Sequence, residues 1–367
     1  MIELTETMNE KVVSLFSEIE DMNHEQVVLC HDKETGLKAI IAIHNTVLGP
    51  AMGGTRMWNY ASEQEAMTDA LRLSRGMTLK NAIAGLNIGG GKAVIIGDAS
   101  KIKNEALMRR FGKFVHSVAG KYYTAEDVNM TTRDMEYIRM ETPYVTGLPE
   151  FMGGAGDPSP YTAYGVYMGM KAAAKKAYGS DDLSGKKVLV QGTGNVGTHL
   201  IDYLTKEGAK VSVSDIFEDK IKKITDRFVV DIIPADEVAH ANVDIYAPCA
   251  LGGTLNDTTI SQLQCDIVAG AANNQLLDEL KHGTQLLERG ILYAPDFLIN
   301  GGGITNVYYE YAGNHSRERV MKQTELIYDT TCRVFDLSQQ SGKTPHEAAI
   351  KIAEERIKSI GNIKLPL

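Results

Sequence analysis

The stretch GLNIGGGK at residues 85–92 places a lysine, Lys92, directly after three consecutive glycines. Ordering glycine costs more backbone entropy than ordering any other residue, so such a run indicates that another group approaches the backbone closely. Lys92 also opens the apolar run KAVIIG, which predicts a buried stem with its charged head at a strand end. We expect the glycines to leave room for a small substrate or a cofactor ring beside this lysine.

A second lysine, Lys80, continues the apolar face of a predicted helix. Ser62 and Glu65 form an S-x-x-E capping box at the start of that helix. The apolar residues of the face recur at helical spacing and are Ala66, Ala70, Leu73 and Met77. A buried ammonium group is costly unless it is paired, so Lys80 is a candidate ligand for a carboxylate. The alternative is a helix that ends before Lys80 and leaves the side chain in solvent.

Two lysines beside one small pocket repel each other. A bound carboxylate would neutralise Lys80, whereas Lys92 could lose its proton and act as a base near neutral pH. The stretch YYTAEDVNM adds two acids, Glu126 and Asp127, where a strand ends before a helix that starts at Thr131 or Thr132. We favour a helix-capping role for Glu126, and Asp127 could relay protons beside a lysine. The sequence alone does not separate the two carboxylates.

The sequence VLVQGTGNVGTHL contains a GxGxxG motif formed by Gly192, Gly194 and Gly197. It follows a predicted strand and opens a predicted helix, and the next strand ends in Asp215, 23 residues after Gly192. This context predicts a dinucleotide site, with the pyrophosphate at the helix N-terminus. Asp215 would bind the adenosine ribose and repel a 2′-phosphate, and the following IFED contains no arginine, so NAD is favoured over NADP. The alternative is a packing turn in a domain that binds no nucleotide.

Three later strand ends carry small or amide residues: APCALGG (247–253), AGAANN (269–274) and APDFLINGGG (294–303). Ligands of open parallel sheets lie beyond the carboxyl ends of the strands. We therefore expect a cofactor crevice there, with Asn273 or Asn274 as hydrogen-bonding groups.

The elements that would position these residues fall into two halves. The breaker-rich stretch TGLPEFMGGAGDPSP (146–160) separates them, followed by helical residues 161–178. The second half alternates strands with helices, and its short apolar strands predict a parallel, doubly wound sheet of the Rossmann type. The predicted fold is α/β with two domains and a cleft between them. We assign residues 1–148 plus 340–367 to a substrate and oligomerisation domain and 149–339 to the NAD-binding domain, because the final helix, about 345–360, could return to the first domain.

Composition excludes several classes of function. The chain has 367 residues and a net charge of −9, which argues against nucleic acid or an anionic membrane as the partner. The four cysteines show no zinc spacing, so we expect no metal site and reduced thiols, as in cytoplasm. The N-terminal MIELTETMNEKV lacks the apolar core of a secretory signal, and no stretch is long and apolar enough to span a bilayer.

With these residues established, the chain resembles the glutamate/leucine/phenylalanine/valine family of amino-acid dehydrogenases, and within it the branch that acts on leucine. The resemblance covers about residues 30 to 310. The matching stretches are LGPAMGGTRMW, RGMTLKNAIAGLNIGGGKAVIIGD, TAEDV, DPSPYTAYGVYMGMKAAAK, QGTGNVG, DIYAPCALGG, VAGAANNQL and YAPDFLINGGGITNV.

The resemblance implies reversible, NAD-dependent oxidative deamination of an L-amino acid to a 2-oxo acid and ammonia. Lys80 would bind the substrate carboxylate, Lys92 would be the catalytic base, and Asp127 would assist proton transfer. Further substrate contacts would come from Gly53, Met77 and Asn274. The implied cofactor-binding residues, besides the glycines of the motif and Asp215, are Thr162, Asn195, Val196, Cys249, Ala250 and Asn273.

The resemblance also places the substrate side chain among Met52, Ala125, Ile304 and Val307. These medium-sized apolar residues include no cation for an acidic substrate and favour leucine, isoleucine or valine over a phenyl ring. The stretch YYEY after Val307 departs from the family pattern and could reshape this pocket or an interface. The alternatives are an aromatic substrate and, further off, an NAD-binding sensor without catalysis. The family also implies a homo-oligomer, namely an octamer.

Overall fold

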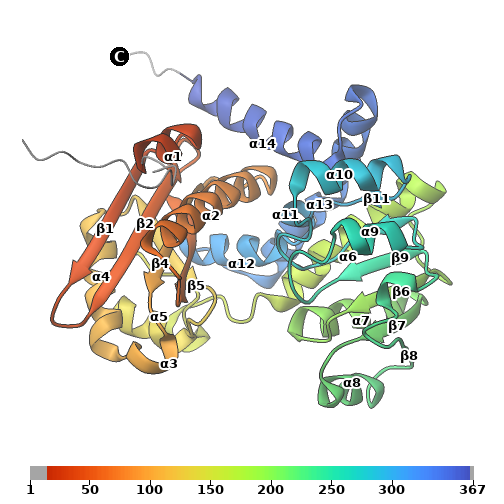
Figure 1. The fold of residues 1–367 in the computed structure, drawn as a ribbon, viewed down its shortest axis with the longest axis horizontal. Helices are drawn as coiled ribbons and strands as arrows, with labels where there is room; N and C mark the ends of the chain where they lie inside the picture. Colours follow the sequence, from red (N-terminus) through yellow and green to blue (C-terminus); the bar gives the residue numbers. More distant parts are fainter. Residues whose placement is uncertain (1–14, 364–367) are drawn as a thin grey trace, which may run out of the picture.

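The computed structural model describes residues 15–363, which form two α/β units with helices between them (Figure 1). The predicted fold class is confirmed. The N-terminal segment 1–12, which we interpreted as not being a secretory signal, lies outside the described residues. Within those residues, no helix is both long and apolar enough to cross a bilayer.

The first unit contains a five-stranded mixed sheet in the order β1-β2-β4-β3-β5. Its strands are β1 (Gln26–Asp32), β2 (Leu37–Asn45), β3 (Ala51–Trp58), β4 (Gly89–Ile96) and β5 (Tyr122–Glu126). The pairs β1–β2 and β2–β4 are antiparallel, whereas β3 pairs in parallel with both β4 and β5. The parallel pairs place the carboxyl ends of β3, β4 and β5 at one edge. β4 begins three residues earlier than predicted, so it includes the glycines before Lys92.

Helices cover both faces of this sheet because apolar residues of its central strands alternate between the faces. Ile41 and Ile95 pack toward α4 (Glu105–Ser117) and α5 (Thr132–Arg139). Ile40 and Val94 pack toward α2 (Glu63–Ile83). The short helices α1 (Leu15–Asp21) and α3 (Ala99–Ile102) flank the unit.

Only half of the predicted capping box of α2 is present. The hydroxyl of Ser62 accepts a hydrogen bond from the Glu65 amide at 3.1 Å, as expected for an N-cap. The carboxylate of Glu65, however, accepts from the Ala61 amide at 2.7 Å instead of from Ser62.

The second unit is a doubly wound sheet of six parallel strands in the order β11-β10-β9-β6-β7-β8. The strands are β6 (Lys187–Gln191), β7 (Lys210–Ser214), β8 (Asp231–Ile232), β9 (Ile245–Pro248), β10 (Ile267–Val268) and β11 (Leu292–Tyr293). If the strands are numbered 1 to 6 along the chain from β6, the sheet read from β8 to β11 has the order 3-2-1-4-5-6, which is that of dinucleotide-binding domains. The strand order reverses between β6 and β9. The Rossmann-type prediction is confirmed.

The remaining helices wrap this sheet and connect the units. They are α6 (Ser159–Tyr178), α7 (Asn195–Glu207), α8 (Glu218–Thr225), α9 (Asp257–Gln262), α10 (Glu279–Glu288), α11 (Asp296–Ile299), α12 (Gly302–Tyr311), α13 (Arg317–Ser341) and α14 (Pro345–Gly361), with 3-10 turns η1 (Glu150–Met152) and η2 (Val238–His240). The helices predicted at 161–178, 316–340 and 345–360 are confirmed within two residues at each end.

The last helix, α14, returns to the first unit as expected. Arg356 donates hydrogen bonds to the carbonyl oxygens of Ala82 at 3.2 Å and Leu86 at 2.7 Å, and to Oδ1 of Asn87 at 2.8 Å. At its other end, Ala348 and Ala349 are buried in the core of the second unit. The helix therefore touches both units and holds the end of α2 and the first residues of GLNIGGGK.

The four cysteines carry free thiols. Burial raises the pKa of Cys30 and of Cys249 to about 12, so both thiols stay protonated at neutral pH and pack as small apolar groups. Among residues 15–363, no group of three or more His, Cys, Asp or Glu side chains could hold a metal ion.

Candidate active site

Lys92 on β4 and Asp127, directly after β5, form a buried ion pair with Nζ and Oδ2 2.6 Å apart. Only 6% of the Lys92 surface is exposed, and this burial lowers the pKa of Lys92 while the Asp127 charge opposes the shift. Burial raises the pKa of Asp127, but the charges of Lys92 and Arg56 outweigh it and leave that pKa below its usual value. The structure thus places a lysine that can lose its proton against a carboxylate that remains ionised.

The helix-capping role that we favoured for Glu126 is filled by other residues. Thr131 is the N-cap of α5, and Asp134 completes a capping box with it. Glu126 lies at the surface, and partial burial raises its pKa. Of the two neighbouring acids, Asp127 is therefore the one that reaches the lysine.

Lys80 lies within α2, which runs to Ile83, so the alternative of a helix that ends before Lys80 is wrong. Its Nζ lies 3.5 Å from Oδ1 of Asn273 in the second unit. Burial lowers the pKa of Lys80 to about 8; the Asp296 carboxylate raises it and the Lys92 charge lowers it further. The predicted repulsion between the two lysines is thus present.

The predicted apolar face of α2 is only partly right. Ala66 and Ala70 are fully buried, but Leu73 and Met77 are partly exposed, as is Lys80. The other buried residues of this face are Met67, Leu71, Ser74, Thr78 and Leu79. The side chains at 73, 77 and 80 therefore form a stripe beside the core-facing side, which explains how Lys80 can reach a site.

The glycines before Lys92 make room for protein, not for a ligand, which corrects our expectation. A Cβ at Gly90 would overlap the backbone of Thr78 on α2. A Cβ at Gly91 would lie 2.8 Å from the Tyr122 ring, and one at Gly89 would overlap the Asn45 carbonyl oxygen. The glycines thus let α2, which carries Lys80, approach the strand that carries Lys92.

Gly53 lies on β3 beside these lysines. A Cβ on Gly53 would overlap the Gly91 carbonyl oxygen and lie 3.2 Å from Cγ of Met77, so two predicted substrate contacts adjoin each other. The pairing of β3 with β4 skips Gly53 and its neighbour Gly54. The pairing of β3 with β5 includes Gly53, opposite Thr124, and the Gly53 carbonyl also accepts a hydrogen bond from the Tyr122 hydroxyl at 2.7 Å.

Three of the four residues predicted for the substrate side chain share one apolar cluster. Met52, Ile304 and Val307 belong to it, and its aromatic members are Tyr123, Tyr308 and Tyr311. Ala125 lies outside the cluster, two residues after Tyr123 and so on the same face of β5. The rings of Tyr123 and Tyr311 meet edge to face with centroids 4.8 Å apart. The sequence analysis noted YYEY but missed Tyr123.

The three motif glycines have distinct geometric reasons. Gly192 has φ +104°, and a Cβ there would lie 2.8 Å from the backbone of Cys249 and Ala250. A Cβ at Gly197 would overlap the Gly192 carbonyl oxygen, so it allows α7 to pack onto the turn, whereas Gly194 faces open space. Gly194 is also the N-cap of α7, which begins with Asn195 and Val196. This arrangement fits a pyrophosphate at the helix N-terminus.

Asp215 follows β7 and is held by Thr193, whose amide and hydroxyl donate to Oδ2 at 2.8 and 2.9 Å. Burial raises the pKa of Asp215, but these hydrogen bonds outweigh it, so the carboxylate stays ionised. A cavity of about 390 Å³ adjoins Thr193 and the turn. Its lining includes Lys220, Lys223 and Arg227, cations that lie beyond the IFED segment and that the sequence analysis missed.

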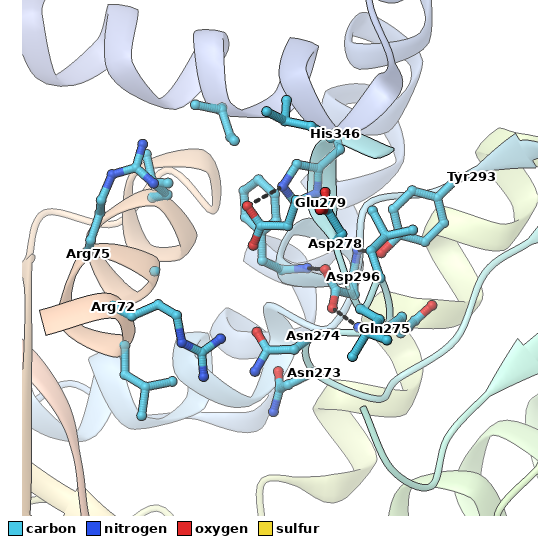
Figure 2. Close-up of a pocket in the computed structure, with 18 residues that line it drawn as sticks. Arg72, Arg75, Asn273, Asn274, Gln275, Asp278, Glu279, Tyr293, Asp296 and His346 are labelled. Atoms are coloured by element: carbon cyan, nitrogen blue, oxygen red, sulfur yellow. Dashed lines mark hydrogen bonds and ion pairs between the residues drawn. The ribbon is translucent and has the colours of Figure 1, made fainter. Parts of the chain in front are cut away.

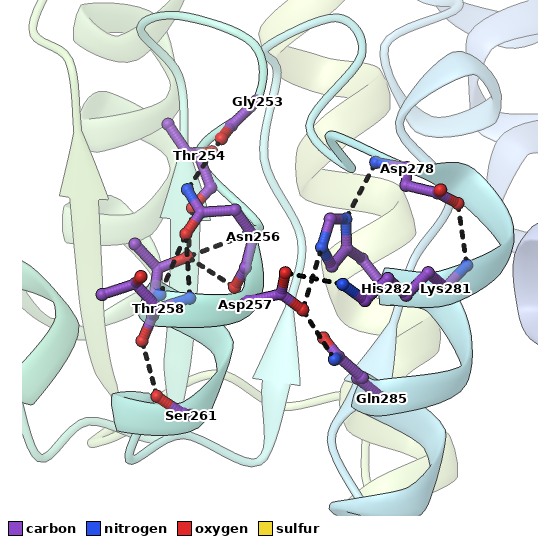
Figure 3. Close-up of polar contacts among 11 residues, drawn as sticks. Gly253, Thr254, Asn256, Asp257, Thr258, Ser261, Asp278, Lys281, His282 and Gln285 are labelled. Atoms are coloured by element: carbon purple, nitrogen blue, oxygen red, sulfur yellow. Dashed lines mark hydrogen bonds and ion pairs between the residues drawn. The ribbon is translucent and has the colours of Figure 1, made fainter.

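The three predicted strand ends converge. The Gly253 amide donates to the Asn274 carbonyl at 2.8 Å, and Nδ2 of Asn300 donates to Oδ1 of Asn273 at 2.8 Å. Below these loops, Asp257 of α9 accepts from Lys281 at 2.7 Å and from Gln285 of α10 at 2.9 Å (Figure 3). The loops after β9, β10 and β11 are therefore cross-linked and form one wall.

Thr162, the residue expected near the nicotinamide, opens α6 beside this wall. Its hydroxyl donates to the Pro158 carbonyl at 3.1 Å. A Cβ on Gly303 would lie 2.6 Å from the same hydroxyl, so Gly303 lets α12 approach Thr162.

Two cavities lie where the two units meet, although neither Lys80 nor Lys92 is among their lining residues. One of about 420 Å³ lies between α2 and the second unit, with Arg72 and Arg75 on one side and Asn273 and Asn274 on the other (Figure 2). The other, of about 700 Å³, is lined by first-unit side chains such as Arg56 and by Leu251 of the second unit. The predicted cleft between the domains is present.

Sequence reasoning missed two groups that act on the lysines. Arg56 contacts Asp127, and Asp296 at the start of α11 raises the pKa of Lys80. The sequence contains a signal for each residue. Arg56 is a charged residue inside the apolar run AMGGTRMW, and Asp296 is an acid in APDFLI, directly after a predicted strand.

Comparison with known proteins agrees with this geometry. Residues 24–144 match the family described as Glu/Leu/Phe/Val dehydrogenase, dimerisation domain, and residues 153–218 and 215–361 match Glutamate/Leucine/Phenylalanine/Valine dehydrogenase. The chain is 53% identical to leucine dehydrogenase of Geobacillus stearothermophilus over 96% of both chains, and 49% identical to valine dehydrogenase of Streptomyces coelicolor over 91% of this chain and 92% of the other.

A solved structure is similar as well. L-tryptophan dehydrogenase from Nostoc punctiforme superposes with a TM-score of 0.85 at 45% identity, covering 95% of this chain and 99% of that one. The family matches span both units, and the relatives extend over nearly the whole chain. The chain therefore belongs to the glutamate/leucine/phenylalanine/valine dehydrogenase family of amino-acid dehydrogenases.

Proposed function

We propose that the protein catalyses the NAD-dependent, reversible oxidative deamination of a branched-chain L-amino acid, leucine first and isoleucine and valine as well. The products are the 2-oxo acid and ammonia. The observation that carries the proposal is the buried Lys92–Asp127 pair beside a second lysine, Lys80, whose ammonium group contacts the Asn273 amide oxygen and forms no ion pair within residues 15–363. The name and high identity of the Geobacillus relative support the choice of leucine.

Lys80 would bind the substrate carboxylate, with Asn274 and the Gly53 backbone as further contacts. Lys92, as a neutral amine, would take a proton from the substrate ammonium group, because hydride leaves Cα more readily when the nitrogen is uncharged. NAD, when bound, supplies the acceptor for that hydride.

Water must then add to the resulting iminium carbon. Lys92 would first pass the proton from the substrate to solvent by way of Asp127, and would then take a proton from this water as its oxygen bonds to carbon, with Asp127 stabilising the charged lysine. Lys92 would give that proton to the nitrogen, and as the C–N bond breaks and ammonia leaves it would take the proton of the hydroxyl group, which becomes the oxo group. Holding Lys92 and Asp127 on and directly after strands of one sheet reduces the entropy cost of each step.

The turn around Gly192 supports NAD as the cofactor. Gly194 leaves open space at the N-terminus of α7, and the ionised Asp215 stands where an adenosine ribose would lie. Asn195 and Val196 would contact the pyrophosphate, and Cys249, Ala250, Asn273 and Thr162 would surround the nicotinamide end. Lys220, Lys223 and Arg227 supply nearby positive charge, so NADP needs a direct comparison.

The apolar cluster around Met52, Ile304 and Val307, with Ala125 nearby, would hold the substrate side chain. Tyr123 and Tyr311 close its far side, which favours a leucyl over a phenyl or indolyl group. One methylene changes discrimination by only about 1–3 kcal/mol, so isoleucine and valine should also react.

We further infer that residues 1–148 and 340–367 form the substrate and oligomerisation domain and 149–339 the NAD-binding domain. The match of residues 24–144 to a dimerisation domain supports a homo-oligomer, for which we propose an octamer. The protonated, free thiols fit a cytoplasmic location.

The test is an assay of NAD and NADP reduction with a panel of L-amino acids, with ammonia measured in parallel. We expect the highest kcat/KM with leucine and NAD. Lys92→Ala should lower kcat by roughly 10²–10⁴-fold while NAD binding is retained. Full turnover in this variant, or a strong preference for phenylalanine, would refute the proposed mechanism or the proposed substrate, respectively.

A further inference from the structure

A third charged side chain contacts the proposed catalytic pair. Arg56 on β3 directs Nε to Oδ2 of Asp127 at 3.1 Å, the same oxygen that Lys92 contacts at 2.6 Å. The Arg56 side chain is 23% exposed and that of Asp127 24%, so water screens their charges only in part. Two cations therefore share one carboxylate oxygen.

Arg56 is itself anchored on its other side. Its Nη1 donates to Oδ2 of Asp69 on α2 at 2.9 Å, and the Tyr60 hydroxyl donates to the same oxygen at 2.7 Å. Arg72 contacts the other oxygen, Oδ1, at 3.2 Å. The planar guanidinium group of Arg56 thus bridges two carboxylates. Arg56 lies on strand β3 and Asp69 on helix α2, so both are held by regular secondary structure.

We propose that Arg56, held by Asp69, is a positioning residue that fixes Asp127 against Lys92 and sets how readily Lys92 gives up its proton. This inference rests on the proposed role of Lys92 as the base. A buried ionic network of this kind needs all its members, because removing one leaves an unpaired charge.

Arg56 and Asp69 have opposite effects on the protonation of Lys92. The positive charge of Arg56 disfavours a proton on Lys92, whereas the negative charge of Asp69 favours it. The other charged groups near Lys92 are Asp127, which favours the proton, and Lys80 on α2, a further cation. The network therefore acts on the protonation of Lys92 as well as on the position of Asp127.

The test is the pH profile of kcat/KM for L-leucine oxidation, whose acidic limb reports protonation of the base in the free enzyme. Arg56→Gln should move this limb up by about 0.5–1 pH unit and lower kcat roughly tenfold or more. Asp69→Asn keeps the shape and the acceptor for Tyr60, and it should move the limb down by about the same amount. Arg56→Lys retains the charge and should leave the limb near that of the parent enzyme, with a lower kcat.

Arg109 provides a matched control, because it also bridges two carboxylates, those of Glu105 and Glu141, but on α4 away from the lysines. Arg109→Gln should leave both kcat and the pH profile unchanged. The inference is overturned if the Arg56→Gln and Asp69→Asn limbs stay in place or move together, or if Arg56→Lys shifts its limb as Arg56→Gln does. Full turnover by Lys92→Ala would instead overturn the role of the base itself, so the two failures are distinguishable.

Discussion

The ammonium nitrogen of Lys80 lies 3.5 Å from the side-chain oxygen of Asn273, although 193 positions separate the two residues in the chain. Lys80 belongs to the first unit and Asn273 to the second, so the contact crosses the cleft. The Asn273 oxygen already accepts a hydrogen bond from Asn300. An amide dipole cannot neutralise a partly buried cation, whereas a substrate carboxylate entering the cleft would.

Lys80 therefore makes substrate binding depend on pH. Its pKa of about 8 means that Lys80, the group that would bind the substrate carboxylate, is positively charged below pH 8 and becomes progressively neutral above it. We expect the inhibition constant of 4-methylpentanoate, which carries no amine, to be constant below pH 8 and to rise roughly tenfold per pH unit above it. Lys80→Met should bind this inhibitor weakly with a flat profile. A flat profile in the parent protein would contradict the assignment of Lys80.

The tyrosine rings beside the apolar cluster should limit substrate size. Tyr311→Leu removes the ring that meets Tyr123 and should raise kcat/KM for phenylalanine relative to leucine about 10-fold, within the range of one pocket change. The measurement is competition between the two amino acids in one assay. Tyr309→Leu, on the same helix but outside the cluster, is the control and should leave the ratio unchanged. An unchanged ratio in the Tyr311 variant would place the side-chain pocket elsewhere.

Asp215 should decide between the two dinucleotides. Asp215→Ser removes the charge that repels a 2′-phosphate, and Lys220 and Lys223 already line the neighbouring cavity. We expect the ratio of kcat/KM for NADP to that for NAD to rise about 10–100-fold. Glu218→Ser, in the first turn of α8, is the control. If both variants keep the parent ratio, Asp215 does not contact the ribose.

Two histidines that contact α2, His24 and His44, should make the free energy of unfolding depend on pH. His24 and His44 meet edge to face with ring centroids 4.8 Å apart, and burial lowers the pKa of each to about 4. The unfolded chain, with an ordinary value of 6.5, binds protons that the folded chain does not. Stability from this pair is therefore complete above pH 6.5 and is lost as the pH falls toward 4.

We expect the apparent Tm to fall by roughly 3–6 °C between pH 7 and 5 because of this pair. His44→Gln preserves a hydrogen-bonding group for Thr78, which contacts Nδ1 of His44 at 2.8 Å, and should reduce the dependence on pH. The measurement is thermal unfolding monitored by circular dichroism over this pH range. His31→Gln changes an exposed histidine and should behave like the parent protein.

Much of the second unit could be predicted without coordinates because its signals are local. The glycines at 192, 194 and 197, the strand before them and Asp215 after the next strand all lie within about 30 residues, and steric rules connect them directly. The apolar runs at 187–191 and 210–214 became neighbouring parallel strands for the same reason. Likewise, the helical spacing that carries Lys80 is a property of α2 alone.

The identity of the partner of each lysine depended on contacts between distant segments. Arg56 and Asp127 are 71 positions apart, and they meet only because β3 pairs in parallel with β5 in one register. Arg356 of α14 reaches Leu86, inside GLNIGGGK, from 270 positions away. The glycines beside Lys92 misled us for the same reason: the atoms that fill their space belong to Thr78, Tyr122 and Asn45. Residue type and spacing indicate that some group comes close to the backbone at these glycines. Which group it is depends on how the strands and helices pack in the folded protein.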